Sequence, residues 1–87
     1  MKIKEGFIVR KVGDENIVVP VGENSKTFHG MIKLNETGCF LWNFFCEEHT
    51  KQEAVQALLD NYEVEESVAQ RDVDAVAALL EHHKFLA

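Results

Sequence analysis

The chain has 87 residues, with one proline, two cysteines and no long apolar run. A membrane-spanning helix needs about 20 consecutive apolar residues and a secretory signal needs an apolar stretch near the start, and neither pattern occurs. A chain this short has room for one small core, so we expect residues 1–87 to form a single domain. These absences favour a small cytoplasmic protein that has no membrane partner.

Cysteine is too scarce and too badly placed for a disulfide or a zinc site. Cys39 and Cys46 lie seven positions apart in one predicted helix, which separates them by roughly 10 Å along its axis. A disulfide requires Cα atoms within about 7 Å. Because the chain also lacks a Cys-x-x-Cys pair, we interpret both cysteines as small buried apolar residues.

Motifs for catalysis are also missing. No histidine forms a recognisable arrangement with a serine or cysteine nucleophile, the four being His29, His49, His82 and His83. Adjacent residues such as His82 and His83 point about 100° apart on a helix, so they do not bind one metal ion together. No glycine-rich phosphate-binding motif occurs. We therefore expect no enzyme activity, no metal and no cofactor.

Basic residues are few in the second part of the chain. Residues 1–34 carry six basic and four acidic side chains, whereas residues 35–87 carry three basic and eleven acidic side chains. The resulting net charge of -8 on the second part would repel a phosphate backbone, which argues against a nucleic-acid partner. The net charge of +2 on the first part would instead attract an acidic partner.

The first part of the chain predicts a three-stranded antiparallel sheet. Residues 7–12 and 17–21 are rich in β-branched residues and flank Gly-Asp-Glu-Asn, a turn composition, so they predict a hairpin. Pro20 should end the second strand, because in mid-strand it would remove a ladder hydrogen bond. Residues 28–34 alternate, with Phe28, Ile32 and Leu34 on one face, and predict a third strand.

The second part of the chain predicts three helices. Asn35 can cap a strongly apolar, aromatic helix over residues 36–47 that should lie at the centre of the core. Thr50 and Glu53 have the spacing of a capping box and open a second helix over residues 51–62. A third helix is expected over residues 66–83. The fold class is therefore α+β, with the sheet preceding the helices.

The third predicted helix carries two stripes with helical spacing. One should face the core and comprises Ala69, Val73, Val76, Ala77 and Leu80. The other flanks it and comprises Val68, Asp72, Ala75 and Leu79. The flanking stripe either widens the buried face or lines one wall of a groove.

The third strand becomes an edge of the sheet if the strands meander in order. An uncovered edge can pair with another chain, so a peptide could add as a fourth strand along residues 31–33 and reach the flanking stripe. The alternative is that the last helix covers this edge.

Several motifs taken together resemble the PqqD-like family. They are Leu34-Asn35-Glu36-Thr37-Gly38, Leu41-Trp42, the helix from Thr50 to Tyr62, Val64, Asp72-Val73 and Leu79-Leu80. The resemblance covers about residues 5–86. It implies a winged helix-turn-helix-like domain of the kind called a RiPP recognition element. Such a domain is a peptide chaperone that binds the leader segment of a ribosomally made precursor peptide. It presents the precursor to a modifying enzyme, commonly a radical S-adenosylmethionine (radical SAM) enzyme, and the founding member serves pyrroloquinoline-quinone (PQQ) biosynthesis.

The resemblance also implies a binding site between the third strand and the last helix. By position this site comprises His29, Met31, Ile32, Lys33, Val68, Asp72, Ala75 and Leu79. Their placement makes Lys33 and Arg71 candidate contacts to acidic leader side chains. The chain departs from the family's Lys-Gly-apolar ending, because His83-Lys84-Phe85 has no glycine, and the sequence does not predict how the last helix is capped.

Two other functions compete with leader binding. One is self-association, in which a second copy fills the free edge or groove to give a homodimer. The other is DNA binding, since winged helices often bind DNA, although four acidic side chains outnumber the two basic ones near the last helix.

Overall fold

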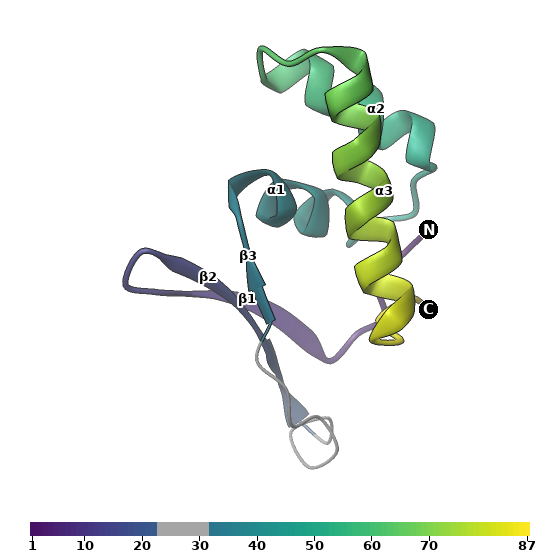
Figure 1. The fold of residues 1–87 in the computed structure, drawn as a ribbon. Helices are drawn as coiled ribbons and strands as arrows, with labels where there is room; N and C mark the ends of the chain where they lie inside the picture. The colour runs from purple at the N-terminus through teal and green to yellow at the C-terminus, as the bar shows by residue number, and fades with distance from the viewer. Residues whose placement is uncertain (23–31) are drawn as a thin grey trace.

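The computed structural model describes residues 1–22 and 32–87, and Figure 1 shows their arrangement. The α+β fold is as predicted, with three strands preceding three helices. They are β1 (Phe7–Val12), β2 (Glu15–Pro20), β3 (Ile32–Leu34), α1 (Glu36–Phe44), α2 (Lys51–Asn61) and α3 (Glu66–His82). The expected start of the third strand, at residues 28–31, lies outside the described residues.

The sheet is antiparallel and its strands follow the order β1-β2-β3. The predicted four-residue turn of the hairpin is wrong, because only Gly13 and Asp14 lie between Val12 and its partner Glu15. Gly13 has a φ of 63°, and glycine is favoured at the first position of a tight hairpin turn with this geometry. Glu15 and Asn16 are strand residues because exposed strand ends tolerate polar side chains. Pro20 ends β2, as predicted.

The two faces of the sheet differ because successive side chains point to opposite sides. Val9, Val18 and Ile32 lie side by side in the register and pack in or against the core. Arg10, Ile17 and Lys33 form the neighbouring row on the opposite face, where Arg10 and Lys33 are exposed but Ile17 is buried. The helices lie on the side of the first row (Figure 1).

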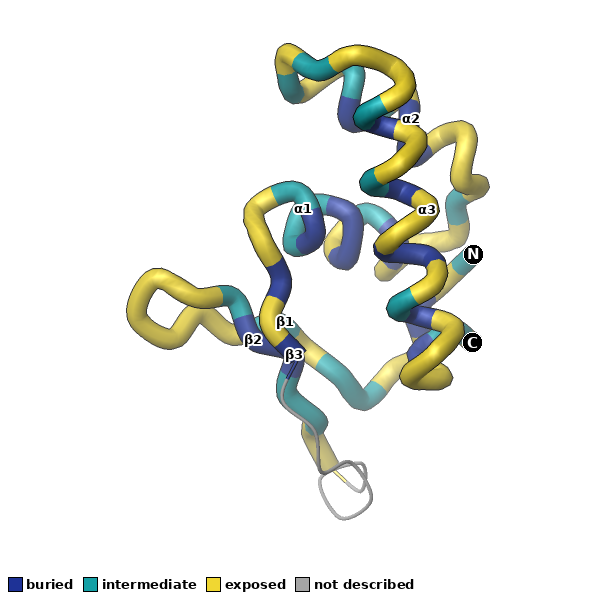
Figure 2. The backbone as a smooth tube through the Cα atoms, viewed as in Figure 1, coloured by how far each residue is buried: buried dark blue, intermediate teal, exposed yellow. Residues whose placement is uncertain are grey.

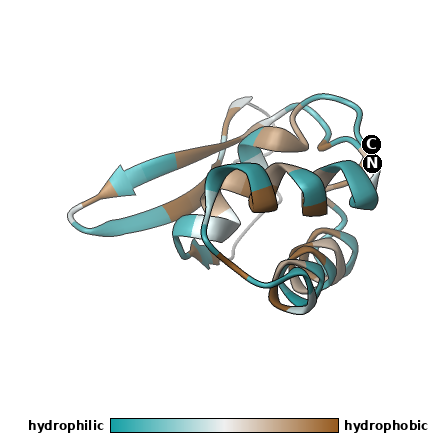
Figure 3. Ribbon diagram, turned by 90° about the horizontal axis from the view of Figure 1, so that it is seen from above, coloured by the Kyte–Doolittle hydropathy of each residue, from teal (hydrophilic) through white to brown (hydrophobic). Residues whose placement is uncertain are grey.

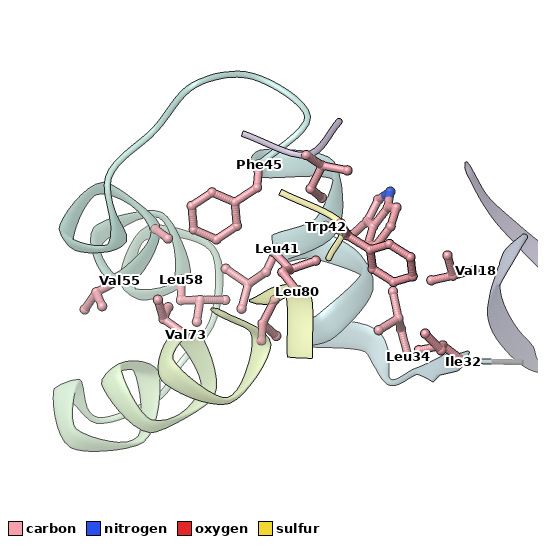
Figure 4. Close-up of a cluster of buried hydrophobic side chains, with 14 of the residues drawn as sticks. Val18, Ile32, Leu34, Leu41, Trp42, Phe45, Val55, Leu58, Val73 and Leu80 are labelled. Atoms are coloured by element: carbon pink, nitrogen blue, oxygen red, sulfur yellow. The ribbon is translucent and has the colours of Figure 1, made fainter. Parts of the chain in front are cut away.

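Helix α1 supplies the centre of the core. Leu41, Trp42 and Phe45 are at most 2% exposed. Figure 4 shows Trp42 on the side of Val18 of the sheet, Leu41 beside Leu80 of α3, and Phe45 on the side of α2. The burial pattern in Figure 2 confirms that each helix turns one stripe inward. The prediction of α1 as the core helix is therefore confirmed.

The end of α1 differs from the prediction. The helix stops at Phe44, three residues before the predicted end, so Cys46 lies beyond it and is exposed, while Cys39 is half-buried. The expectation of two buried thiols is therefore wrong. The chain has no glycine to mark this helix end, which made it hard to locate from the sequence.

The predicted caps at the starts of α1 and α2 are both present. Asn35 Oδ1 accepts a hydrogen bond from the backbone N–H of Gly38 at 2.7 Å. Thr50 Oγ1 accepts from the N–H of Glu53, and Glu53 Oε1 accepts from the N–H of Thr50, at 3.1 and 2.8 Å. The hydrogen bond from Thr50 N–H lowers the pKa of the Glu53 carboxyl.

Helix α3 ends in a Schellman motif without glycine. Lys84 has a φ of 58°, its N–H donates to Glu81 O at 3.1 Å, and the N–H of Phe85 donates to Leu80 O at 2.8 Å. The Phe85 ring is fully buried, with centroids 4.6 Å from Phe7 and 5.4 Å from Trp42. Burial of Phe85 therefore holds Lys84 in a left-handed conformation that a side chain disfavours.

We expect Lys84→Gly to stabilise the protein by about 0.5–1 kcal/mol, because glycine adopts this φ without the Cβ clash that lysine suffers. Urea unfolding measures the change. Lys84→Ala is the matched control, since it removes the same charge but keeps the Cβ. Equal stability of the glycine and alanine variants would contradict the strain at this position.

We expect Asn35→Ala to lower the free energy of unfolding by about 1 kcal/mol, because it leaves helix N–H groups without their side-chain acceptor. Asn43→Ala serves as the control on the same helix, since Asn43 is exposed and its amide has only a long contact of 3.9 Å to Cys39 Sγ. Chemical denaturation should show a change within about 0.5 kcal/mol for the control. Similar losses for the two variants would argue against the cap.

Candidate functional site

Strand β3 is an edge of the sheet over the described residues. It pairs with β2 on one side, and no strand of the described part of the chain pairs with its other side. Ile32 and Leu34 are buried toward the core, while Lys33 is exposed on the opposite face. The predicted alternation and the predicted edge position are both confirmed for Ile32–Leu34. His29 and Met31, also placed in the site by the sequence, lie outside the described residues.

Lys33 has an ion-pair partner within the sheet. Its Nζ lies 3.2 Å from Glu15 Oε1, and both side chains are more than half exposed. An exposed pair of this kind contributes at most about 1 kcal/mol. A carboxylate on an incoming peptide could therefore replace Glu15 at small cost.

The flanking stripe of α3 lies at the border between core and solvent. Val68, Asp72 and Leu79 are half-buried, and Ala75 is exposed. Leu79 packs against the outside of the core. The stripe is therefore neither wholly buried nor wholly exposed, and it offers partly covered apolar surface.

Arg71 lies on the solvent side of this stripe. Its side chain is 74% exposed, and its Nε lies 3.9 Å from Asp72 Oδ1. At 100° per residue, Arg71 lies nearly opposite the centre of the core-facing stripe. Its only link to the flank among the described residues is this contact with Asp72.

Helix α1 lies between β3 and α3 (Figure 1). It starts two residues after β3, and its half-buried Phe40 packs edge-on against Tyr62 at 5.5 Å and lies 6.5 Å from Phe44. The sequence interpretation treated these aromatic residues as core. At 100° per residue, Phe40 and Phe44 lie more than 100° from the centre of the buried stripe of α1, and this was the available signal that they would remain partly exposed.

A hollow of about 300 Å³ lies elsewhere, between α2 and α3. Its lining residues are Lys51, Gln52, Val55, Glu66, Gln70, Val73 and Asp74. Lys51 Nζ lies 3.6 Å from Asp74 Oδ1 at this hollow. Helical spacing places the lining residues of α3 on the side of the helix away from the flanking stripe. Figure 3 gives a second view of the helices. The sequence did not predict this hollow.

The described residues contain no group of three or more His, Cys, Asp or Glu side chains placed to hold a metal ion. His82 and His83 lie side by side, with ring centroids 4.9 Å apart, at the end of α3. Within the described ranges, no helix has the length and apolarity needed to cross a membrane.

The fold of the chain is similar to that of a solved protein structure. Among solved structures, the chain is similar to "TbiB1 in Complex with the TbiA(beta) Leader Peptide", with a TM-score of 0.73 and 22% sequence identity. The match covers 99% of this chain and 94% of that chain. Comparison with curated proteins gives no match.

A family model matches most of the chain. The model is described as "Coenzyme PQQ synthesis protein D (PqqD)" and matches residues 15–86, which include all three helices, β2 and β3. The resemblance seen in the sequence motifs is confirmed. The chain belongs to the PqqD family.

Proposed function

We propose that this protein is a peptide chaperone that binds the leader segment of a ribosomally made precursor peptide. The leader adds as a fourth strand along β3, beside the flanking stripe of α3. The observation that carries the proposal is the open edge of β3 in a PqqD-family fold whose last helix has the partly exposed stripe Val68, Asp72, Ala75 and Leu79.

The similar structure supports the same interpretation. TbiB1 was solved in complex with the TbiA(beta) leader peptide, and its fold matches nearly the whole of this chain. From that structure we take only the kind of ligand, a leader peptide.

Strand addition explains how one site gives both affinity and selectivity. The backbone of β3 would supply hydrogen bonds that any extended peptide can make. Alternate leader side chains would then point toward the helices, where half-buried Leu79 and Val68 offer apolar contact. The remaining side chains would point outward beside Lys33, where an acidic residue would be favoured. Burial of one Leu-sized side chain contributes roughly 1.5–3 kcal/mol, enough to select an apolar leader residue.

The other edge of the sheet is less suitable for the leader. β1 is also unpaired on its outer side over the described residues and is longer than β3. However, β3 leads directly into α1, so a peptide on β3 has a helix wall beside it. The preference for β3 therefore follows from the contacts that alternate leader side chains can make.

Presentation to an enzyme completes the proposal. The bound precursor would be handed to a peptide-modifying enzyme, with a radical SAM enzyme as the first candidate and PQQ biosynthesis as one pathway that fits. The chain itself would act in the cytoplasm as an adaptor without catalytic residues.

We expect Leu79→Asp to weaken leader binding at least tenfold, because the charge replaces apolar contact worth more than about 1.4 kcal/mol. Isothermal titration with the leader segment of the precursor encoded beside this gene measures the affinity. Circular dichroism before each titration establishes that the variant is folded.

Leu59→Asp is the matched control for this experiment. Leu59 is also a half-buried leucine packed against the outside of the core, but it lies on α2. It should lose similar stability and keep the affinity of the unaltered protein within about twofold. Equal affinity for the Leu79 variant would contradict the site.

A further inference from the structure

The outer face of the sheet carries an apolar patch that the core does not use. The patch comprises the exposed Ile8 and Val12 and the half-buried Val19 around Arg10, which share one face by strand alternation and register, and we call it the outer patch. Ile17 lies on the same face but is only 7% exposed, so it is not part of the patch. Ile8 is 46% exposed and Val12 is 54% exposed. Val21, which follows β2 directly, is the remaining large apolar side chain exposed among the described residues.

The outer patch has no structural role in the core. None of its residues belongs to the core cluster or packs against it, whereas Phe7 and Val9, which alternate with them along β1, do. Exposed aliphatic side chains gathered on one face mark a surface that another molecule covers. Their absence from the core favours an interaction role over a folding role.

Arg10 gives the outer patch its specificity. It lies opposite Ile17 in the register, with Ile8 and Val12 two residues away on the same strand. On the far side of Ile17, Lys33 is paired with Glu15, but Arg10 forms no ion pair among the described residues. An arginine surrounded by apolar side chains is typical of interface centres, where its planar fork binds a carboxylate through two hydrogen bonds.

We propose that the outer patch docks a folded protein that presents a carboxylate among apolar side chains. The identification of this partner as the enzyme that modifies the precursor rests on the proposed function. A second copy of this chain is the competing occupant, because Glu15 lies on the same face and could meet Arg10 of the other copy in a two-fold contact. It fits less well because Glu15 is already paired with Lys33.

The outer patch and the leader site are close enough to be contacted together. Strands are spaced about 4.8 Å apart, so a leader added to β3 would lie about 14 Å from β1 across the sheet. Every second leader side chain would extend the outer face beside Lys33. A partner of ordinary interface size would therefore touch both the outer patch and the leader. Bound leader should therefore strengthen binding of the enzyme, and bound enzyme should strengthen binding of the leader by the same factor.

Charge reversal tests the outer patch. Arg10→Glu should weaken binding of the modifying enzyme encoded beside this gene at least tenfold, both with and without leader peptide. Lys11→Glu is the matched control, because Lys11 is the exposed neighbour of Arg10 on the same strand but belongs to the opposite face. The control should change the affinity less than twofold. Biolayer interferometry with the purified enzyme gives both values.

Val12→Ser tests the apolar part of the patch and should weaken enzyme binding severalfold, since Val12 is exposed at the end of β1 and lies outside the core cluster. Equal losses for Arg10→Glu and Lys11→Glu, or no binding of the enzyme to the unaltered protein, would overturn the proposal. A dimer of the unaltered protein that Val12→Ser dissociates would also overturn the proposal. Size exclusion across a dilution series detects such a dimer.

Leader affinity separates this proposal from the proposed function. Arg10→Glu should bind the free leader as tightly as the unaltered protein, within about twofold. If the unaltered protein binds the enzyme through the outer patch but binds no leader, the proposed function fails and the docking surface stands. A loss of leader binding in Arg10→Glu would instead overturn the separation of the two surfaces.

Discussion

The corner where β3 becomes α1 determines where the candidate site lies. Leu34 is buried at the end of β3, and the next residue, Asn35, caps α1 through the 2.7 Å hydrogen bond to Gly38 N–H. A Cβ on Gly38 would lie 3.0 Å from Asn35 Oδ1 and 3.5 Å from Leu34 Cβ. Close approach of strand and helix therefore depends on a residue without a side chain, and it holds the edge of the sheet beside α1.

The core and the C-terminal segment hold this corner in place. Trp42 of α1 contacts the buried Phe85 ring, which follows α3 and also contacts Phe7 at the start of β1. Lys4 N–H donates to Phe85 O at 2.8 Å, which joins the first residues of the chain to the last. One aromatic cluster thus connects the sheet, α1 and α3, so that the strand edge and the α3 stripe keep a fixed separation.

Local signals in the sequence were enough to predict the caps and the order of elements. Asn35, Thr50 and Glu53 act within one helical turn, so their spacing alone specified the two helix starts. The left-handed Lys84 could not be predicted, because its conformation follows from the burial of Phe85 against distant aromatic rings. The outer patch could not be predicted from the sequence either. β1 is apolar on both faces, and only the position of the helices decides which face is covered.

The candidate site was partly predictable for the same reason. Alternation gave the outward position of Lys33, and helical spacing gave the half-buried flank with Leu79. The exposure of Arg71 follows from that same spacing, and its contact with an acidic leader side chain stays a prediction. The pairing of Lys33 with Glu15 could not be predicted without the hairpin register. The polar composition of residues 13–16 had placed Glu15 in the turn and not in β2.

Amide hydrogen exchange measured by NMR, with and without saturating leader peptide, tests strand addition most directly. The sheet has two open edges over the described residues, so the experiment compares β3 with β1 in one sample. The account predicts slower exchange within Ile32–Leu34 and unchanged exchange along Phe7–Val12. Protection along β1 with none at β3, or no protection at either edge, would contradict it.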